Sequence, residues 1–136
     1  MCFVNLIPNV QKTFVIFSLN YIFEYTINLN KKTIMMISAN DPMRKTWLPV
    51  ESDSDFPIQN IPFGVFITKD DIITIGTRIG NYAIDLSALQ MLGYFKGIEL
   101  TDDVFLQDTL NDFISNGKKT WRAVRNRIAE IFDQNN

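Results

Sequence analysis

Alternating apolar and polar positions in the middle of the chain predict two or three short strands. Residues 63–68 are rich in β-branched and aromatic side chains, and a polar turn, Lys69-Asp70-Asp71, separates them from a second run at residues 72–79. Gly80-Asn81 is a two-residue turn of the kind that favours a hairpin into residues 82–85. We therefore expect a small curled sheet or barrel, whose second strand carries on one face Ile73, Ile75, Thr77 and Ile79.

Helical spacing follows in the second half of the chain. Ser87 is a suitable cap for a short helix over residues 88–92. A second helix is predicted to begin at Asp108 or Thr109 and to stop at Gly117. Small strands followed by helices are typical of an α+β unit, here mainly β, with helices appended on its carboxy-terminal side.

Residues 119–132 have the spacing of an amphipathic helix. The apolar stripe consists of Trp121, Val124, Ile128 and Ile131 or Phe132, and the other face carries Arg122, Arg125, Arg127 and Glu130. The arginines, with Trp121 beside them, are one possible surface for binding nucleic acid. Acidic neighbours and a net charge of -2 favour a solvated face instead, with Trp121 as a core anchor.

Residues 54–66 form a tightly specified piece of backbone. Pro57 and Pro62 fix their own φ and hold the preceding residue extended, so this segment is predicted to be an ordered arch and not a helix or a central strand. The amides of Gln59 and Asn60 can satisfy backbone groups that the arch leaves without ladder partners. Four apolar side chains are expected to hold the arch against a core: Phe56, Ile61, Phe63 and Phe66.

Composition limits the chemistry. The chain has 136 residues, 46% of them hydrophobic and 21% charged, as expected for one globular domain. It has no histidine, which removes the commonest general base and the commonest transition-metal ligand. Cys2 is the one cysteine, so an intrachain disulfide and a cysteine-rich zinc site are excluded and a reducing compartment is favoured.

Residues 1–34 differ from the rest, because they contain no Ala, Gly, Asp or Arg. A signal peptide is not favoured, since no basic residue precedes Lys12 and no small-x-small cleavage site follows the apolar run at 14–19. No apolar stretch reaches the length of about 18 residues that a membrane span needs. We expect residues 1–35 to be an atypical extension outside the fold, such as translated upstream sequence, and residues 36–136 to form one domain.

Three other clusters carry little chemical signal. Residues 51–55 place carboxylates at alternate positions but lack the glycine and the terminal glutamate of a calcium loop, so Ser54 or Asp55 is expected to hydrogen-bond the backbone at the start of the arch. Asp102-Asp103 is an adjacent acid pair in a loop, which favours a solvated or capping role over catalysis. The glycines of residues 76–80 do not open a helix as a phosphate cradle does, and they indicate a strand bulge and the hairpin turn.

A series of motifs runs in order from residue 47 to residue 132. Its strongest member is Phe-Pro-Ile-Gln-Asn-Ile-Pro-Phe-Gly-Val-Phe at residues 56–66. The others are Trp47-Leu48-Pro49-Val50, Arg-Ile-Gly-Asn-Tyr-Ala-Ile-Asp-Leu-Ser-Ala-Leu at residues 78–89, Thr109-Leu110-Asn111-Asp112-Phe113 and Trp121-Arg122-Ala123-Val124-Arg125. Together the motifs resemble the amino-terminal domain of fumarylacetoacetases.

The resemblance implies a hydrolase that cleaves a carbon-carbon bond of 4-fumarylacetoacetate, giving fumarate and acetoacetate in tyrosine and phenylalanine breakdown. It also implies calcium and magnesium, held by carboxylates beside a histidine that activates water, all in a larger carboxy-terminal catalytic domain that is absent from these residues. We therefore assign no catalytic, cofactor-binding or metal-binding residue to this chain. For the present domain the resemblance implies an SH3-like barrel with appended helices, and for the full enzyme a homodimer in the cytoplasm.

Two functional hypotheses follow. In the first, the chain is a non-catalytic accessory domain that packs on the missing catalytic domain through Phe56, Pro57, Ile61 and Phe63, with neither nucleic acid nor a membrane as partner. In the second, it is an independent small-barrel adaptor for a protein or nucleic-acid partner, which rests on fold class alone. Under both hypotheses the isolated chain is expected to be inactive as an enzyme.

Overall fold

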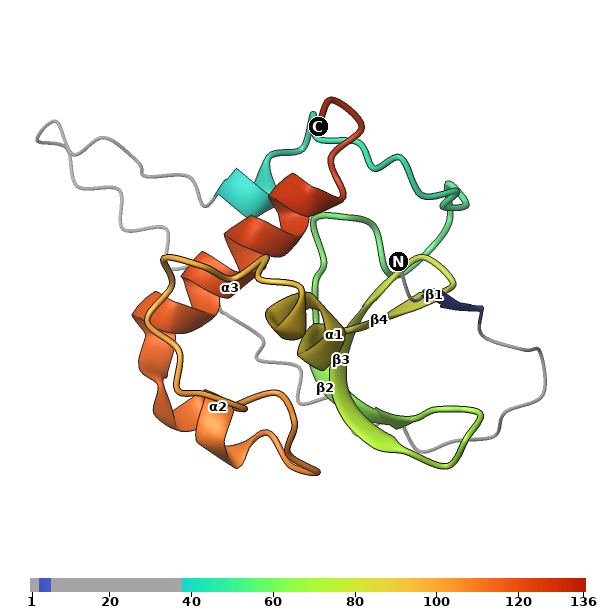
Figure 1. The fold of residues 1–136 in the computed structure, drawn as a ribbon. Coiled ribbons are helices and arrows are strands. Elements are labelled where there is room, and N and C mark those ends of the chain that lie inside the picture. Colours follow the sequence, from blue (N-terminus) through green and yellow to red (C-terminus); the bar gives the residue numbers. More distant parts are fainter. Residues whose placement is uncertain (1–2, 6–37) are drawn as a thin grey trace, which may run out of the picture.

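The computed structural model describes residues 3–5 and 38–136 and contains one antiparallel sheet (Figure 1). The strands are β1 (Phe3–Asn5), β2 (Phe63–Ile67), β3 (Ile73–Ile79) and β4 (Tyr82–Asp85), in the spatial order β1-β4-β3-β2. The predicted strands after the arch are confirmed, as is the tight turn between β3 and β4, where Gly80 has a φ of 56°. This positive φ suits glycine because a Cβ atom is disfavoured there.

The predicted bulge at Gly76 is wrong. Gly76 stands in regular register, opposite Gly64 on β2 and opposite Asp85 on β4. A Cβ atom at this position would lie against the ring of Phe66 and 2.5 Å from the carbonyl oxygen of Ile84. Glycine is therefore needed here for the close approach of a side chain and not for an extra residue in the strand.

Three α-helices and one short 3-10 helix accompany the sheet: η1 (Ser38–Asn40), α1 (Leu86–Met91), α2 (Asn111–Ser115) and α3 (Gly117–Ile131). In Figure 1, α1 lies against β3, while α3 runs from α2 to the carboxy-terminal end and passes beside η1. These three α-helices hold more residues than the four strands, so the described fold is a mixed α+β unit and not mainly β. Within residues 3–5 and 38–136, no helix combines the length and apolar character needed to cross a membrane.

The core lies between the sheet, α3 and the loop that follows α1. A chain of aromatic rings crosses it, with centroid distances of 4.8 Å for Phe63 and Phe113, 5.0 Å for Phe113 and Phe105, and 5.4 Å for Phe105 and Phe95. The apolar stripe of α3 enters the same core, where the buried members are Val124, Ile128, Ile131 and Phe132. Trp121 packs against this cluster, which confirms its predicted role as a core anchor.

The helix starts differ from those predicted. The cap of α1 is Asp85 and not Ser87, because the Asp85 carboxylate accepts hydrogen bonds from the backbone N–H groups of Ser87 and Ala88. The α2 helix begins after Leu110, without a side-chain cap, and not at Asp108 or Thr109. Gly117 ends α2 as predicted, and its φ of 77° lets the chain turn directly into α3.

Two finer predictions have different outcomes. The described sheet is open, with β1 and β2 at its two edges, so closure into an SH3-like barrel is not confirmed. The expectation that residues 1–35 lie outside the fold concerns residues 1–2 and 6–35, which belong to the part of the chain that the structure does not describe, together with residues 3–5, which pair with β4. It stays a prediction.

Candidate functional site

The proline arch, defined here as residues 54–62, is ordered by backbone hydrogen bonds within it and to the β3–β4 turn. The N–H of Asn60 donates to the carbonyl of Pro57 at 2.8 Å, which closes a turn inside the arch. The N–H of Gly80 donates to the carbonyl of Phe56 at 2.7 Å, which attaches the arch to the sheet. The Ser54 hydroxyl accepts from the N–H of Phe56 at 3.2 Å, which confirms the predicted role of Ser54 at the start of the arch.

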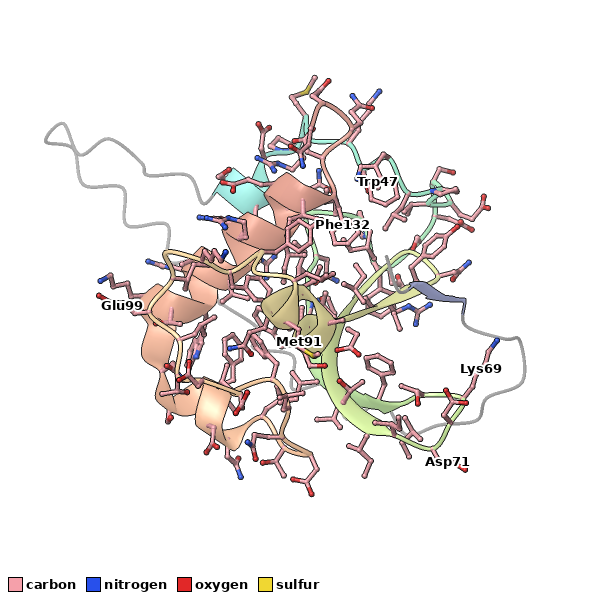
Figure 2. The ribbon with its side chains drawn as sticks, viewed as in Figure 1. Trp47, Lys69, Asp71, Met91, Glu99 and Phe132 are labelled. Carbon is pink, nitrogen blue, oxygen red and sulfur yellow. The ribbon has the colours of Figure 1, made fainter. Side chains whose placement is uncertain are left out.

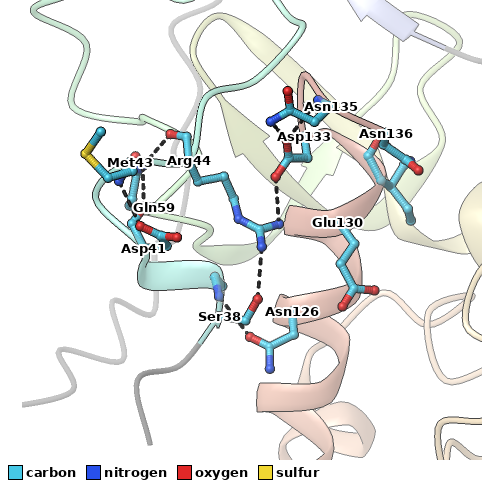
Figure 3. A network of polar contacts seen from close by, with 12 residues as sticks. Ser38, Asp41, Met43, Arg44, Gln59, Asn126, Glu130, Asp133, Asn135 and Asn136 are labelled. Atoms are coloured by element: carbon cyan, nitrogen blue, oxygen red, sulfur yellow. Dashed lines mark hydrogen bonds and ion pairs between the residues drawn. The ribbon is translucent and has the colours of Figure 1, made fainter. Parts of the chain in front are cut away.

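The side-chain amides of the Gln-Asn pair complete the arch. The Nε2 of Gln59 donates to the carbonyl oxygens of Asp41 at 2.9 Å and Arg44 at 2.7 Å, and Figure 3 shows these three residues side by side. The Nδ2 of Asn60 donates to the carbonyl of Asp55 at 2.9 Å. Both amides therefore satisfy backbone acceptors that have no ladder partner, as the sequence predicted.

Arg125 on α3 holds the arch through hydrogen bonds to its backbone. Its guanidinium donates to the carbonyl of Gln59, to the carbonyl of Ile61 at 3.5 Å and to the Oδ1 of Asn40 at 3.1 Å. Burial lowers the pKa of Arg125 from its ordinary value, since the charged form loses water. An arginine stays protonated near neutral pH even so, and these three acceptors replace part of its hydration.

The prediction that Arg125 belongs to a solvated face is wrong. The sequence contained a signal for its true position, because Arg125 stands four residues after Trp121 and three before Ile128, and so falls on the apolar stripe. From this position on α3 the guanidinium reaches the carbonyl groups of the arch. Arg122, by contrast, is exposed, as predicted.

A second arginine ties residues 38–47 to the end of α3 (Figure 3). Arg44 donates to the Ser38 hydroxyl at 2.9 Å and forms an ion pair with Asp133, with 3.3 Å between its Nη1 and the carboxylate. The Oδ1 of Asn126 accepts from the N–H of Ala39 at 3.1 Å. These contacts hold η1 and residues 41–47 against α3. In this position the carbonyl groups of Asp41 and Arg44 lie within reach of the Gln59 amide.

Trp47 fixes the far end of this segment. Its ring lies 5.4 Å from that of Phe132, and its Nε1 donates to the carbonyl of Ile131 at 3.1 Å. Figure 2 labels Trp47 and Phe132 near the carboxy-terminal end of α3. The tryptophan of the first family-like motif is therefore part of the attachment of residues 38–47 to the helix.

The four residues predicted to pack on another domain occupy different environments. Ile61 is 1% exposed and Phe63 is 8% exposed, so this chain already covers both. Phe56 is half-buried beneath the guanidinium of Arg78, whose Cζ lies 4.1 Å from the ring centroid, and Pro57 is exposed. A single chain does not test an interdomain contact, and the surface available for one at this place consists of Phe56 and Pro57.

The acidic residues are dispersed over the described part of the chain. Among residues 3–5 and 38–136, no group of three or more Asp, Glu or Cys side chains could hold a metal ion. Asp102 and Asp103 are exposed and line a shallow hollow of about 400 Å³ beside α1. The described residues provide an ordered arch that is hydrogen-bonded to three parts of the chain: α3, the β3–β4 turn and residues 38–47.

Comparison with known proteins extends these observations to a family. The family model described as fumarylacetoacetase N-terminal matches residues 59–136, from the middle of the proline arch to the last residue given. This chain belongs to that family. The match includes Gln59 and Arg125, the two residues that join the arch to α3.

Curated relatives agree with this assignment. The chain is 40% identical over 93 residues to a fumarylacetoacetase of Arabidopsis thaliana, which covers 67% of this chain and 22% of the relative. It is 43% identical over 88 residues to that of Dictyostelium discoideum (64% and 21%), and 42% identical over 81 residues to that of Homo sapiens (59% and 19%). The aligned part of this fumarylacetoacetase N-terminal chain thus spans about a fifth of the length of these relatives.

Proposed function

We propose that this chain serves as the non-catalytic amino-terminal accessory domain of a fumarylacetoacetase. The observation that carries the proposal is the family match over residues 59–136 in a chain that spans about a fifth of its curated relatives. The full enzyme would hydrolyse 4-fumarylacetoacetate to fumarate and acetoacetate in tyrosine and phenylalanine breakdown. Its remaining part, which would contain the catalytic domain, is the proposed partner, within a homodimer.

The chemistry of the reaction favours a non-catalytic role for this chain. Cleaving a β-diketone with water calls for a cation to hold the developing enolate, an activated water and a proton donor to the departing carbanion. The chain has no histidine, and the carboxylates of its described part do not gather in a group of three. We therefore place calcium and magnesium in the partner and give this domain the task of stabilising that partner.

We also propose that the sheet of this domain is part of an SH3-like barrel. The β2–β3 and β3–β4 hairpins followed by helices are the parts that an SH3-like barrel would contribute. A closed barrel would need a further strand at the edge formed by β2. Hydrogen exchange at the outward N–H groups of β2, in the isolated chain and in a full-length protein, would measure whether that edge becomes paired.

A chimaera tests the proposal. Residues 36–136 of this chain would be inserted in place of the matching segment of the Dictyostelium discoideum fumarylacetoacetase. We expect a folded enzyme that consumes 4-fumarylacetoacetate, while the same enzyme without the segment is unstable and the isolated chain is inactive with added calcium or magnesium. An inactive or unfolded chimaera contradicts the accessory role, and turnover by the isolated chain contradicts the non-catalytic one.

No contact among the described residues favours the alternative of an independent adaptor. The coding sequence immediately downstream distinguishes the two hypotheses. A following frame that encodes a histidine-containing, carboxylate-rich hydrolase domain agrees with the accessory role, whether as one gene or as a split one.

A further inference from the structure

A hollow beside α1 combines an apolar wall with an acidic rim. The α1 hollow, as we call it, has a volume of about 400 Å³ and is lined by Ser87, Gln90, Met91, Asp102, Asp103 and Leu106. Met91 is 78% exposed and Leu106 is 53% exposed, so two large apolar side chains of the hollow face solvent. Figure 2 shows Met91 on α1, near the centre of the view.

The polar side of the hollow offers hydrogen-bond acceptors. Asp102 and Asp103 are exposed, and neither takes part in an ion pair within residues 38–136. Gln90 donates through Nε2 to the carbonyl of Thr101 at 3.4 Å, while its Oε1 is buried and has no hydrogen-bond partner in the described part of the chain. Two carboxylates therefore lie around one hollow that contains no cationic side chain.

These features match a lysine or arginine side chain. Such a side chain has a long apolar stem, which would pack on Met91 and Leu106, and a cationic head with several donors for the two carboxylates. A bare metal ion fits less well, because Met91 and Leu106 give the hollow an apolar side and no group of three acidic ligands exists among the described residues. A nucleic-acid phosphate would be repelled by the two aspartates.

We propose that the α1 hollow receives a lysine or arginine side chain from the carboxy-terminal part of fumarylacetoacetase. This inference rests on the proposed function, and charge complementarity selects the side chain. About four-fifths of the length of the relatives lies outside the match, so the partner has ample surface from which to supply it. Leu92, which follows Met91 and is 63% exposed, would extend the apolar part of the same contact.

The chain offers a matched control for the acidic rim. In the chimaera described above, Asp102→Asn with Asp103→Asn removes the two charges, and Asp70→Asn with Asp71→Asn removes two charges from the β2–β3 turn. Asp71 and Asp103 have φ values of 58° and 60°, a region that asparagine tolerates, so the two double variants carry the same backbone requirement. All four aspartates are exposed.

We expect the double variant at Asp102 and Asp103 to lower the Tm of the chimaera by about 3 °C or more, and the one at Asp70 and Asp71 to leave it almost unchanged. The difference between the two double variants should shrink as the ionic strength is raised, because salt screens the lost ion pair. In the isolated chain, both double variants should change the Tm equally, since no partner is present. This comparison separates docking from the stability of the domain itself.

The apolar wall has its own matched pair. Met91→Gln replaces the apolar side chain in the hollow with a polar one of similar length, and Met43→Gln does the same at a methionine that is 79% exposed, against 78% for Met91. Met91→Gln should lower the Tm of the chimaera further than Met43→Gln, while the two variants of the isolated chain should have equal Tm values. The variants of the acidic rim and of the apolar wall thus test the two ends of the same proposed side chain.

Several results would overturn the inference. Equal effects of the two aspartate pairs in the chimaera, or a loss specific to Asp102 and Asp103 in the isolated chain, would show that the hollow docks nothing. Stabilisation of the isolated chain by calcium or magnesium that requires Asp102 and Asp103 would show a cation site. Self-association that requires Met91 would show a second copy as the occupant, and a chimaera that does not fold would remove the proposed function and this inference together.

Discussion

Arg125 on α3 donates a hydrogen bond to the backbone carbonyl of Gln59, which stands 66 positions earlier in the chain. The same Gln59 uses its side-chain amide to donate to the carbonyl groups of Asp41 and Arg44. One residue of the proline arch thus joins the last helix to the segment at residues 38–47. The shape of the arch depends on contacts that are distant in sequence, so its loss should be felt across the domain.

Arg125→Met should lower the free energy of unfolding by about 2–4 kcal/mol, because buried carbonyl groups of the arch lose their charged donor. Arg122→Met, an exposed position on the same helix, should change it by less than about 0.5 kcal/mol. Arg125→Lys should lie between them, since lysine keeps the charge but not the planar fork. Urea unfolding followed by tryptophan fluorescence measures all three, and equal losses for the two methionine variants would refute the anchoring role.

Gln59→Glu should be more damaging than its small size suggests. It replaces a donor with a carboxylate that faces the carbonyl oxygens of Asp41 and Arg44, at a cost of about 2–3 kcal/mol. Asn60→Asp is the control, because the same exchange of an amide for an acid occurs there at an exposed position. Hydrogen exchange at the N–H groups of Arg44 and Trp47 should quicken only in Gln59→Glu, and unchanged protection would argue against the link.

The sequence predicted the local parts of this site but not how they meet. Two prolines and a Gln-Asn pair were enough to predict an ordered arch and the use of its amides, because these depend on φ and on local hydrogen-bond supply. The contact with Arg125 depends on how α3 packs, which no local rule gives. A charged residue on an apolar stripe was the available clue, and the balance of charges around it favoured a solvated face.

The fold shows the same division. Strand limits followed from alternation and from the Gly80-Asn81 turn, whose conformation is set within the turn itself. Sheet closure depends on pairing at the edges of β1 and β2, which the pattern of a single strand does not specify. The sequence predicts Ser87 as the cap of α1, two residues after the observed cap, because Ser87 and Asp85 are both good capping residues. Asp85 also accepts from the Thr74 hydroxyl on β3, a contact that local sequence does not reveal.

Asp85→Ala should destabilise the junction of β4 and α1 by about 1–3 kcal/mol. The Asp85 carboxylate accepts from two backbone N–H groups of α1, from the Ser87 hydroxyl at 2.6 Å and from the Thr74 hydroxyl on β3 at 3.0 Å. Asp108→Ala is a suitable control, because Asp108 is exposed and does not cap α2. Thermal unfolding compares the two, and similar Tm values for them would contradict the capping role.

Phe56→Ala tests the proposed packing of the arch on a partner. In the isolated chain it removes a ring that is half-buried beneath Arg78, and a loss of about 1 kcal/mol is expected. In the chimaera the loss should be larger, because the exposed edge formed by Phe56 and Pro57 would also lose its partner. Ile114→Ala, on an apolar side chain that is 38% exposed, is the control, and equal losses in both proteins would count against this surface.

Gly76→Ala should be among the most damaging single-methyl additions in the sheet. The new Cβ would lie against the ring of Phe66 and 2.5 Å from the carbonyl oxygen of Ile84, and backbone cannot yield as a flexible side chain can. Overpacking of this kind costs about 1–3 kcal/mol, mainly through displacement of β2 from β3. Gly97→Ala serves as the control, because no atom lies within 4 Å of its added Cβ and only its φ of 84° opposes the change.

The double variant Gly76→Ala with Phe66→Leu identifies the cause. If the clash with the ring dominates, the smaller leucine should recover part of the lost Tm, and the two changes should be non-additive because the residues are in contact. If the Ile84 carbonyl dominates, the double variant should be at least as unstable as the sum of the single ones. Full additivity, with Gly76→Ala no worse than Gly97→Ala, would show that the sheet does not need glycine at this position.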